Sequence, residues 1–304
     1  MKPYLFRIPE WLGRIPEWIP GLGGTQIGGR PIFSYGVMLG ISFLVCAVLG
    51  LRLATRLGAD RTKTPGLMLW AAVGAILGAR VLYFAASAPG TFTLARFFRF
   101  QDGGLVAYGG FLGGIGASLI YARMARIDWL TVADGFAPTL LLGTGITRTG
   151  CFLYGCDYGQ PTTLAWALRF PRWDNPAVTP WIKGNAPAYA DHLNQALITH
   201  GQGFSEGVHP TQLLMSINGF LGFAVLMVLL PYRRFRGQLI AAFLIYYGVS
   251  RFLVELLRGD AIRGVGVLGT PFSTSQLISL LLAPVGVALW FYLGRLHQSQ
   301  QRSK

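Results

Sequence analysis

Arg148 is the only charged residue in the apolar stretch from 136 to 156. As a helix, a stretch of this length rises about 30 Å, which is roughly the thickness of the hydrocarbon core of a bilayer. An arginine at that depth costs about 2.5–3.5 kcal/mol on insertion scales, so such residues usually face a protein interior and serve a function. We therefore expect Arg148 to contribute to a buried anion-binding site. The alternative is an arginine whose side chain reaches the membrane interface.

A second apolar stretch, from 239 to 257, carries Arg251 and Glu255, and Arg258 follows it directly. These three residues are spaced i, i+4 and i+7, so they line one face of a helix. Glu255 is expected to neutralise one arginine and to leave a net positive charge for a ligand. Arg80, late in a third apolar stretch, adds another cation. The set predicts an anion held within the membrane, and the alternative for the trio is a structural ion pair between helices.

The elements that must position these charges are transmembrane helices. Of the 304 residues, 52% are hydrophobic and only 12% are charged, whereas a soluble domain carries about 25% charged residues. We predict an all-α integral membrane protein with about seven transmembrane helices and a small extracytoplasmic cap. The predicted spans cover residues 34–54, 67–87, 104–122, 130–151, 210–231, 238–257 and 273–294.

The loops between the spans predict the orientation. Arginine and lysine cluster in the short loops on one side, which the positive-inside rule places in the cytoplasm. The N-terminus then lies outside and the C-terminus inside. The expected organisation is an extracytoplasmic interfacial segment at 1–33, helices one to four at 34–157 with an outer arm at 88–103, an extracytoplasmic cap at 158–208, and helices five to seven with a cytoplasmic tail at 209–304.

Composition also limits the partners. Lysine and arginine outnumber acidic residues by 26 to 12, but they are dispersed among apolar segments, so the lipid bilayer is the expected partner rather than nucleic acid. No cleavable signal peptide is predicted. Cys151 and Cys156 are five residues apart, which is not the usual spacing of metal or redox motifs. We expect them to be packing residues and expect no metal site, with a disulfide on an oxidising face as the alternative.

The third span begins with a glycine-rich run, GGLVAYGGFLGGIG. Gly109 with Gly113, and Gly110 with Gly114, form two small-xxx-small pairs, which predict close packing against another helix. Tyr108 lies within this contact, either as a packing residue or as a hydroxyl group that reaches a polar site.

Seven short motifs resemble, in their order, those of the prolipoprotein diacylglyceryl transferase family, bacterial enzymes that lipidate lipoprotein precursors. The motifs are SYG at 34–36, GAR at 78–80, DGGLVAYGG at 102–110, RTGCFLYGCDYG at 148–159, HPTQL at 209–213, YGVSRFLVELLR at 247–258 and SQL at 275–277. They cover nearly every predicted span, and the resemblance places the protein in the bacterial cytoplasmic (inner) membrane.

The resemblance implies roles for the matching positions. Arg148 and Arg251 look like the phosphate-facing arginines of the family, and Glu255 looks like the acid that orients them. Together with Tyr108 they form the expected catalytic set. The expected substrate-binding residues are Tyr35, Arg80, Gly104, Gly159, His209, Gln212 and Arg258.

The chain departs from one common form of the family at four positions. The family often has histidine at the position of Tyr108, asparagine and glutamate at Cys151 and Cys156, and glutamate at Met215. Some members carry the tyrosine and cysteine forms, so these departures do not predict a loss of activity.

The reaction implied by the resemblance is the attack of a cysteine thiolate on phosphatidylglycerol. The thiolate belongs to the lipobox of a prolipoprotein signal peptide, the diacylglyceryl group is transferred to it, and glycerol phosphate leaves. Arginines would stabilise the departing phosphate, and a base would deprotonate the thiol, whose pKa is ordinarily near 8.5. Glu255, His209 and Tyr108 are the candidate bases, and no cofactor is required.

Two other functions remain open from the sequence. A transporter could bind an anionic solute or lipid through the same arginines, although the two halves of the chain show no matching repeat of the kind common in transporters. A catalytically inactive homologue could bind prolipoproteins without modifying them.

Overall fold

The computed structural model describes residues 4–7, 31–87, 90–99, 104, 106–173, 185–260 and 269–302. Most of the predicted interfacial segment at 1–33 and part of the outer arm at 88–103 lie outside these residues, as does part of the predicted cap. Contacts divide the chain into two compact units, which are described separately. The first contains the described parts of Met1–Phe6, Pro31–Gly50 and Ala133–Lys304, and the second those of Arg7–Arg30 and Leu51–Val132.

Helices occupy all seven predicted spans. They are α1 (Ser34–Arg56), α2 (Thr64–Leu82), α4 (Ala107–Ala125), α5 (Trp129–Tyr154), α7 (Thr211–Leu229), α8 (Gln238–Glu255) and α9 (Thr274–Arg302). The shorter elements are β1 (Tyr4–Arg7), β2 (Pro31–Phe33), a π-helical turn (Tyr83–Ser87), α3 (Leu94–Phe97), α6 (Pro187–Asn194) and a 3-10 turn (Leu230–Tyr232). The strands pair as a two-stranded sheet, which an all-α prediction did not include.

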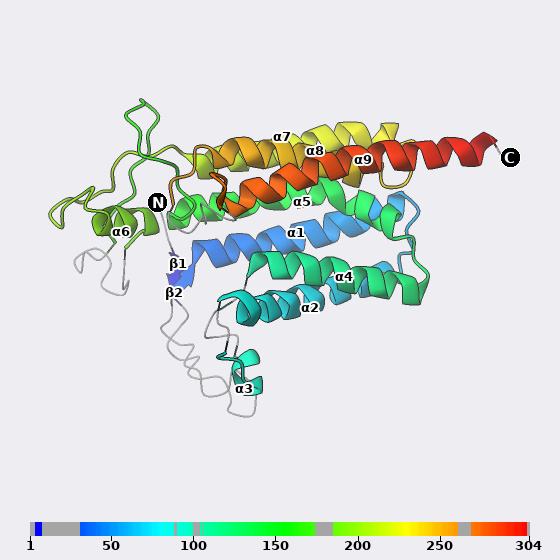
Figure 1. Cartoon of the computed structure of the whole chain (residues 1–304), viewed down its shortest axis with the longest axis horizontal. Coiled ribbons are helices and arrows are strands. Elements are labelled where there is room, and N and C mark those ends of the chain that lie inside the picture. Colours follow the sequence, from blue (N-terminus) through cyan, green and yellow to red (C-terminus); the bar gives the residue numbers. More distant parts are fainter. Residues whose placement is uncertain are drawn as a thin grey trace. The chain divides into compact units, whose positions relative to one another are not determined.

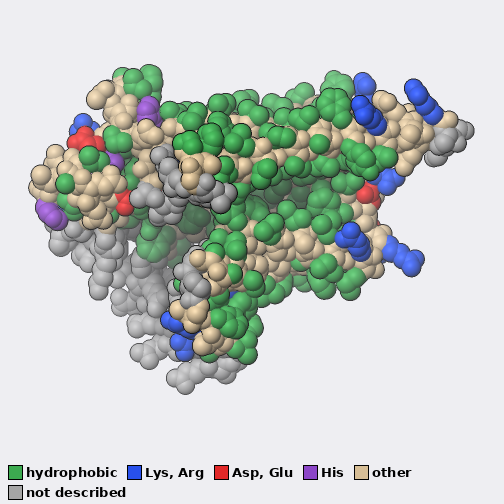
Figure 2. Space-filling view, in the orientation of Figure 1, with side chains coloured by type: hydrophobic (Ala, Val, Ile, Leu, Met, Phe, Trp, Pro, Cys, Tyr) green, Lys and Arg blue, Asp and Glu red, His purple; other side chains and the backbone are tan. Residues whose placement is uncertain are grey.

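Five of the described helices, α1, α2, α7, α8 and α9, are long and apolar enough to cross a membrane. The remaining long helices, α4 and α5, are interrupted by glycine, threonine and charged residues, which lower their mean hydropathy. Hydrophobic side chains cover much of the length of the helices in Figure 2, and lysine and arginine gather mainly near helix ends. The protein is a multi-pass membrane protein, and the count of seven spans stays a prediction.

Glycines let the helices of the first unit approach closely. A Cβ atom added at Gly219 of α7 would lie 2.6 Å from the backbone nitrogen of Gly145 on α5, and one added at Gly248 of α8 would lie 2.8 Å from the nitrogen of Ala283 on α9. Accordingly, α5, α7, α8 and α9 run alongside one another in Figure 1. This bundle carries Arg148 on α5 and Arg251 and Glu255 on α8.

A buried carboxylate connects α5 to the start of α8 in the same unit. Asp134 is fully buried, and its Oδ2 atom lies 2.7 Å from Nε of Arg233. Two backbone N–H groups, from Gly237 and Ile240, also donate to this carboxylate, at 2.7 and 2.9 Å. Asp134 therefore satisfies N–H groups at the beginning of α8, which have no partner within the helix.

The described residues of the predicted cap, 158–173 and 185–208, have a small hydrophobic core of their own. Tyr158, Phe170 and Tyr189 are buried in this cluster, to which α6 contributes. The Tyr158 hydroxyl donates a hydrogen bond of 2.7 Å to Oδ2 of Asp191. The segment thus packs as a compact layer at the end of α5, whereas its extracytoplasmic position stays a prediction.

In the second unit, α2 and α4 cross through their glycines. A Cβ atom added at Gly109 would collide with the carbonyl oxygen of Gly78, and one added at Gly113 would collide with that of Gly74. Gly110 and Gly114 face alanines of α2 on the same side of the crossing. The predicted packing of the two small-xxx-small pairs against another helix is confirmed.

We expect Gly113→Ala to lower the stability of the protein, because the new methyl group meets a backbone carbonyl that can only move with its helix. Gly116→Ala is the matched control on α4, since a Cβ there meets nothing within 4 Å, and alanine is favoured over glycine in a helix by about 0.5–1 kcal/mol. Thermal unfolding of the detergent-solubilised variants measures the difference. An unchanged midpoint for Gly113→Ala would show that the crossing can widen without cost.

Candidate active site

Two arginines from different helices bind one carboxylate. Nη1 of Arg148 lies 2.8 Å from Oδ2 of Asp157, and Nη2 of Arg258 lies 2.7 Å from Oδ1. Arg148 belongs to α5, and Arg258 lies three residues beyond the last residue of α8. Asp157 therefore ties together the ends of two helices that are separated by about a hundred residues of sequence.

A second carboxylate joins Arg251 to the same network. Nη2 of Arg251 lies 2.8 Å from Oε2 of Glu255, and Nη1 of Arg258 lies 3.6 Å from the same oxygen. The hydroxyl group of Ser273 donates to Oε1 at 2.9 Å, and Ser275 accepts a hydrogen bond of 3.0 Å from Arg251. The predicted common face of Arg251, Glu255 and Arg258 is confirmed, and Glu255 is held on both of its oxygens.

Among the residues that the structure describes, the charges of this network balance. Arg258 also forms a two-point contact with Asp260, in which Nε and Nη2 lie 2.7 and 2.6 Å from the carboxylate oxygens. Three arginines therefore face three carboxylates, the third being Glu255. The expected surplus of positive charge is wrong for this network, because two acids from the turns that follow α5 and α8 join it.

The protonation states of the bridging groups follow from their neighbours. Burial alone would raise the pKa of Asp157, but the guanidinium groups of Arg148 and Arg258 outweigh burial and hold that pKa well below its usual range. Burial would lower the pKa of Arg258, but its hydrogen bonds with Asp260 and the charge of Asp157 raise it. These groups are charged at neutral pH, so any anion that entered the site would compete with a carboxylate already in place.

A tyrosine that the sequence did not single out lies close to both principal arginines. Tyr247 lies within electrostatic range of Arg148 and of Arg251, and the two arginines lie within such range of each other. The structure therefore brings Arg148 and Arg251 to one site. Tyr247 precedes Arg251 by four residues, which puts both side chains on the same face of α8. This spacing in the sequence could have indicated that Tyr247 lies near the site.

The turn after α5 has an unusual backbone that presents Asp157. Gly155 and Asp157 have positive φ angles of +84° and +55°, and only glycine adopts such angles without cost. The Thr211 hydroxyl donates to the carbonyl oxygen of Asp157 at 2.8 Å, and Nε2 of the fully buried Gln212 donates to that of Cys156 at 2.8 Å. Gln212, predicted as a substrate-binding residue, is thus engaged in holding this turn.

Gly159 and His209 lie where three segments of the chain meet. Gly159 forms an antiparallel bridge with Arg258, and its N–H group donates to the carbonyl oxygen of His209 at 3.1 Å. A Cβ atom at Gly159 would lie 2.5 Å from Cβ of His209. This position therefore requires glycine, and it connects the start of α7 to the arginine network.

Tyr35 lies in the first turn of α1, beside the same end of α5. A Cβ atom at Gly150 would lie 3.3 Å from Cα of Tyr35, and the ring of Tyr35 is centred 6.5 Å from that of Tyr154. Its hydroxyl group interacts electrostatically with Arg148 and Asp157. The structure therefore brings Tyr35 into the neighbourhood of the network, and its role in substrate binding stays a prediction.

Arg80, Gly104 and Tyr108 belong to the second unit. Arg80 is buried, and its guanidinium group donates to four backbone carbonyl oxygens at 2.6–3.0 Å, those of Arg96, Phe97, Arg99 and Gly104. These hydrogen bonds hold the segment around α3 against the end of α2. Gly104, whose carbonyl oxygen is one of the acceptors, has a φ of +77°. Tyr108 is half-buried in the first turn of α4. A direct role of these three residues in substrate binding stays a prediction.

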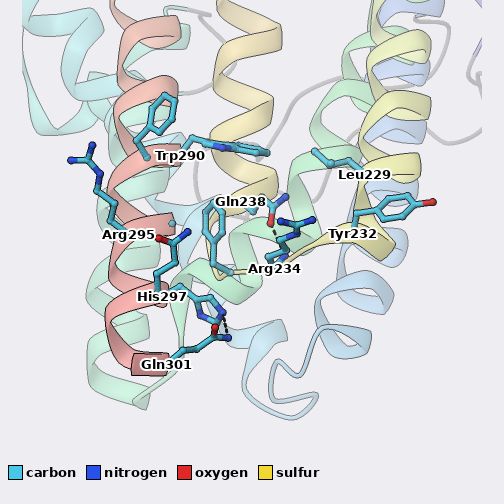
Figure 3. Close-up of a pocket in the computed structure, with 12 residues that line it drawn as sticks. Leu229, Tyr232, Arg234, Gln238, Trp290, Arg295, His297 and Gln301 are labelled. Carbon is cyan, nitrogen blue, oxygen red and sulfur yellow. Dashed lines mark hydrogen bonds between the residues drawn. The ribbon is translucent and has the colours of Figure 1, made fainter. Parts of the chain in front are cut away.

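A pocket with a volume of about 850 Å³ lies elsewhere in the first unit. It is lined by residues at the start of α8 and the end of α9, among them Gln238, Trp290, Arg295 and His297 (Figure 3). Arg251 follows Gln238 by 13 residues on α8, a helical rise of about 20 Å. The pocket is therefore distinct from the arginine network and contributes nothing to it.

The fold and the site define a helical multi-pass membrane protein with a buried arginine–carboxylate network where its helices end. The profile of the family described as prolipoprotein diacylglyceryl transferase matches residues 24–292, and the chain belongs to this family. It is similar to the phosphatidylglycerol–prolipoprotein diacylglyceryl transferase of Clostridium tetani, with 29% identity covering 86% of this chain and 93% of the relative. A Clostridium perfringens relative, numbered 2 under the same name, is 30% identical over 87% of this chain and 92% of its own. A Bordetella parapertussis relative of that name is 29% identical over 89% and 94%.

Proposed function

We propose that the protein transfers the diacylglyceryl group of phosphatidylglycerol to the lipobox cysteine of prolipoproteins and releases glycerol phosphate. The observation that carries this proposal is the convergence of Arg148 and Arg251 on one site within the membrane helices of a member of this family. Planar guanidinium groups bind phosphate through two parallel hydrogen bonds. Charge that develops on a leaving phosphate is stabilised most when such donors are already oriented.

The ion pairs suggest how the arginines are kept ready. Asp157 and Glu255 hold Arg148 and Arg251 in place before substrate enters. Because Asp157 is partly exposed, we propose that the phosphodiester of the lipid takes its place against Arg148. Glu255 is engaged by Arg251 and Ser273, so we assign it the role of orienting Arg251, not that of the base.

The substrate class can be tested with purified protein in vesicles that contain a lipobox peptide and one donor lipid at a time. Peptide lipidation is expected with phosphatidylglycerol and not with phosphatidylcholine or phosphatidylethanolamine. Equal transfer from all three lipids would contradict the proposed donor. Binding of the peptide without lipidation would favour the inactive homologue.

We also propose a role at the site for Tyr108, the position at which one common form of the family has histidine. If its hydroxyl group contacts substrate or takes part in proton transfer, Tyr108→Phe should lower the rate of transfer severely, and Tyr108→His should retain activity. The rates are measured at saturating lipid and peptide. If the phenylalanine variant were as active as the parent, Tyr108 would be a packing residue only.

We propose that the protein lies in the bacterial inner membrane with its N-terminus and the 158–208 segment outside and its C-terminus in the cytoplasm, because the short loops on one side are rich in arginine. In a variant whose three cysteines are replaced by serine, Asn194→Cys should react with an impermeant maleimide in intact spheroplasts. Arg295→Cys, exposed near the end of α9, should react only after lysis. The reverse pattern would invert the orientation.

A further inference from the structure

The turn that ends α5 brings two cysteines together. Gly155 has a φ of +84°, and the N–H group of Cys156 donates to the carbonyl oxygen of Cys151 at 3.2 Å. The Schellman ending of a helix typically has a glycine with a positive φ. The residue after this glycine donates its N–H group to the carbonyl oxygen five residues earlier. In that ending the side chains three residues before the cap and two residues after it commonly touch. Cys151 and Cys156 occupy these two positions.

The sulfur atoms lie inside the proposed active site. Sγ of Cys151, Sγ of Cys156 and a carboxylate oxygen of Asp157 all lie within 4.8 Å of one another. Nη1 of Arg148 is 3.7 Å from Sγ of Cys151. Cys151 is buried and Cys156 is half-buried, so the pair can be reached from one side.

We propose that Cys151 and Cys156 form a redox pair whose oxidation to a disulfide switches off the arginine site. The formation of the disulfide concerns the two thiols alone. The loss of activity rests on the proposed function.

The oxidation requires a disulfide as co-reactant, either a small-molecule or a protein disulfide. One cysteine loses its proton, and its thiolate attacks a sulfur of the oxidant, whose other sulfur leaves as a thiolate. The second cysteine loses its proton and attacks the resulting mixed disulfide, which releases the remaining sulfur of the oxidant. One S–S bond breaks and one forms. The oxidant gains two electrons and the two protons, and the cysteine pair loses them.

The expected effect on the site follows from the position of Asp157. A disulfide requires an S–S distance of about 2.05 Å, so the sulfur atoms must approach and Cys156 must move with them. Asp157 is the next residue, and its oxygens bind Arg148 and Arg258. Oxidation therefore displaces the carboxylate that orients Arg148, and it removes the thiol group beside that arginine.

A bound thiophilic metal ion is the competing interpretation of this cluster. Both oxygens of Asp157 already have a guanidinium partner, and a second cation would have to overcome this positive charge. The arrangement therefore favours redox chemistry of the two thiols, and metal binding becomes one outcome of the test.

The test is incubation of the reduced, purified protein with oxidised glutathione, followed by intact mass and peptide mapping. The expected result is the loss of two hydrogen atoms, assigned to a bond between Cys151 and Cys156. Cys46→Ser should still form this bond, because Cys46 lies on α1 and contacts Thr139. Cys151→Ser and Cys156→Ser should instead retain glutathione or stay reduced. Formation of no bond, or protection of both thiols until a zinc chelator is added, would overturn the proposal.

Lipid transfer is measured on the same samples. The oxidised protein should transfer at least tenfold more slowly, and dithiothreitol should restore the rate. Cys46→Ser should respond in the same way, because Cys46 lies on α1 and contacts Thr139. Full activity of the oxidised protein would refute the switch. A reduced protein without any transfer activity would instead refute the proposed function, and the mass result would still decide whether the pair forms.

Discussion

Replacing Arg148 or Arg251 with glutamine is expected to reduce the rate of diacylglyceryl transfer at least about 100-fold, the scale on which removal of one oriented donor acts in other enzymes. Glutamine keeps polarity and approximate length but loses the charge and the planar pair of donors. Lysine keeps the charge as a single point, so Arg148→Lys and Arg251→Lys should also be severely impaired. The measurement is transfer to a lipobox peptide under saturating lipid.

The control for this prediction separates chemistry from folding. Arg295→Gln changes an exposed arginine at the far end of α9 and should leave the rate near that of the parent. In Arg148→Gln, Asp157 keeps Arg258 as its ion-pair partner, so this variant should stay folded while its activity is low. Near-normal turnover of a folded Arg148→Gln or Arg251→Gln protein would remove that arginine from the site.

The second large effect concerns stability and lies outside the active site. Asp134→Ala is expected to lower the free energy of unfolding by about 3–5 kcal/mol, as is typical when one partner of a buried ion pair is removed. The substitution leaves Arg233 without its carboxylate, and it also leaves the N–H groups of Gly237 and Ile240 without their acceptor. Denaturant unfolding of the solubilised protein gives the value.

A double-mutant cycle with Arg233→Ala tests whether the ion pair is the cause. The loss in the double variant should be clearly smaller than the sum of the two single losses, because the charge left unpaired by the first substitution is then also absent. Asp60→Ala removes an exposed carboxylate near α2 and should have a much smaller effect. Additive losses at Asp134 and Arg233 would show that the two residues act independently.

The sequence predicted the elements well because their signals are local. Apolar stretches of membrane length placed all seven long helices, and the small-xxx-small pairs around Gly109 predicted close packing against another helix, which the structure identifies as α2. The spacing of Arg251, Glu255 and Arg258 predicted a shared face, which their ion pairs confirm. Each of these features depends on the period of one helix or on one short run of residues.

The partners of the arginines could not be predicted in the same way. Asp157 meets Arg258 across 101 residues of sequence, and it does so from a turn with a left-handed backbone. No helical period relates such residues. A local signal was present for the cysteines, however: Gly155 between Cys151 and Cys156 fits a Schellman ending, which would have placed the two thiols together before the structure was known.

The stoichiometry of the reaction tests the central claim most directly. The protein is reconstituted in vesicles with phosphatidylglycerol that carries a radiolabelled headgroup, and a lipobox peptide is added. We predict one glycerol phosphate released for each peptide modified, with the diacylglyceryl group attached to the cysteine sulfur as a thioether, and no product with a peptide whose cysteine is serine. Release of glycerol phosphate without peptide modification, or an unmodified peptide despite folded protein and saturating lipid, would contradict the account.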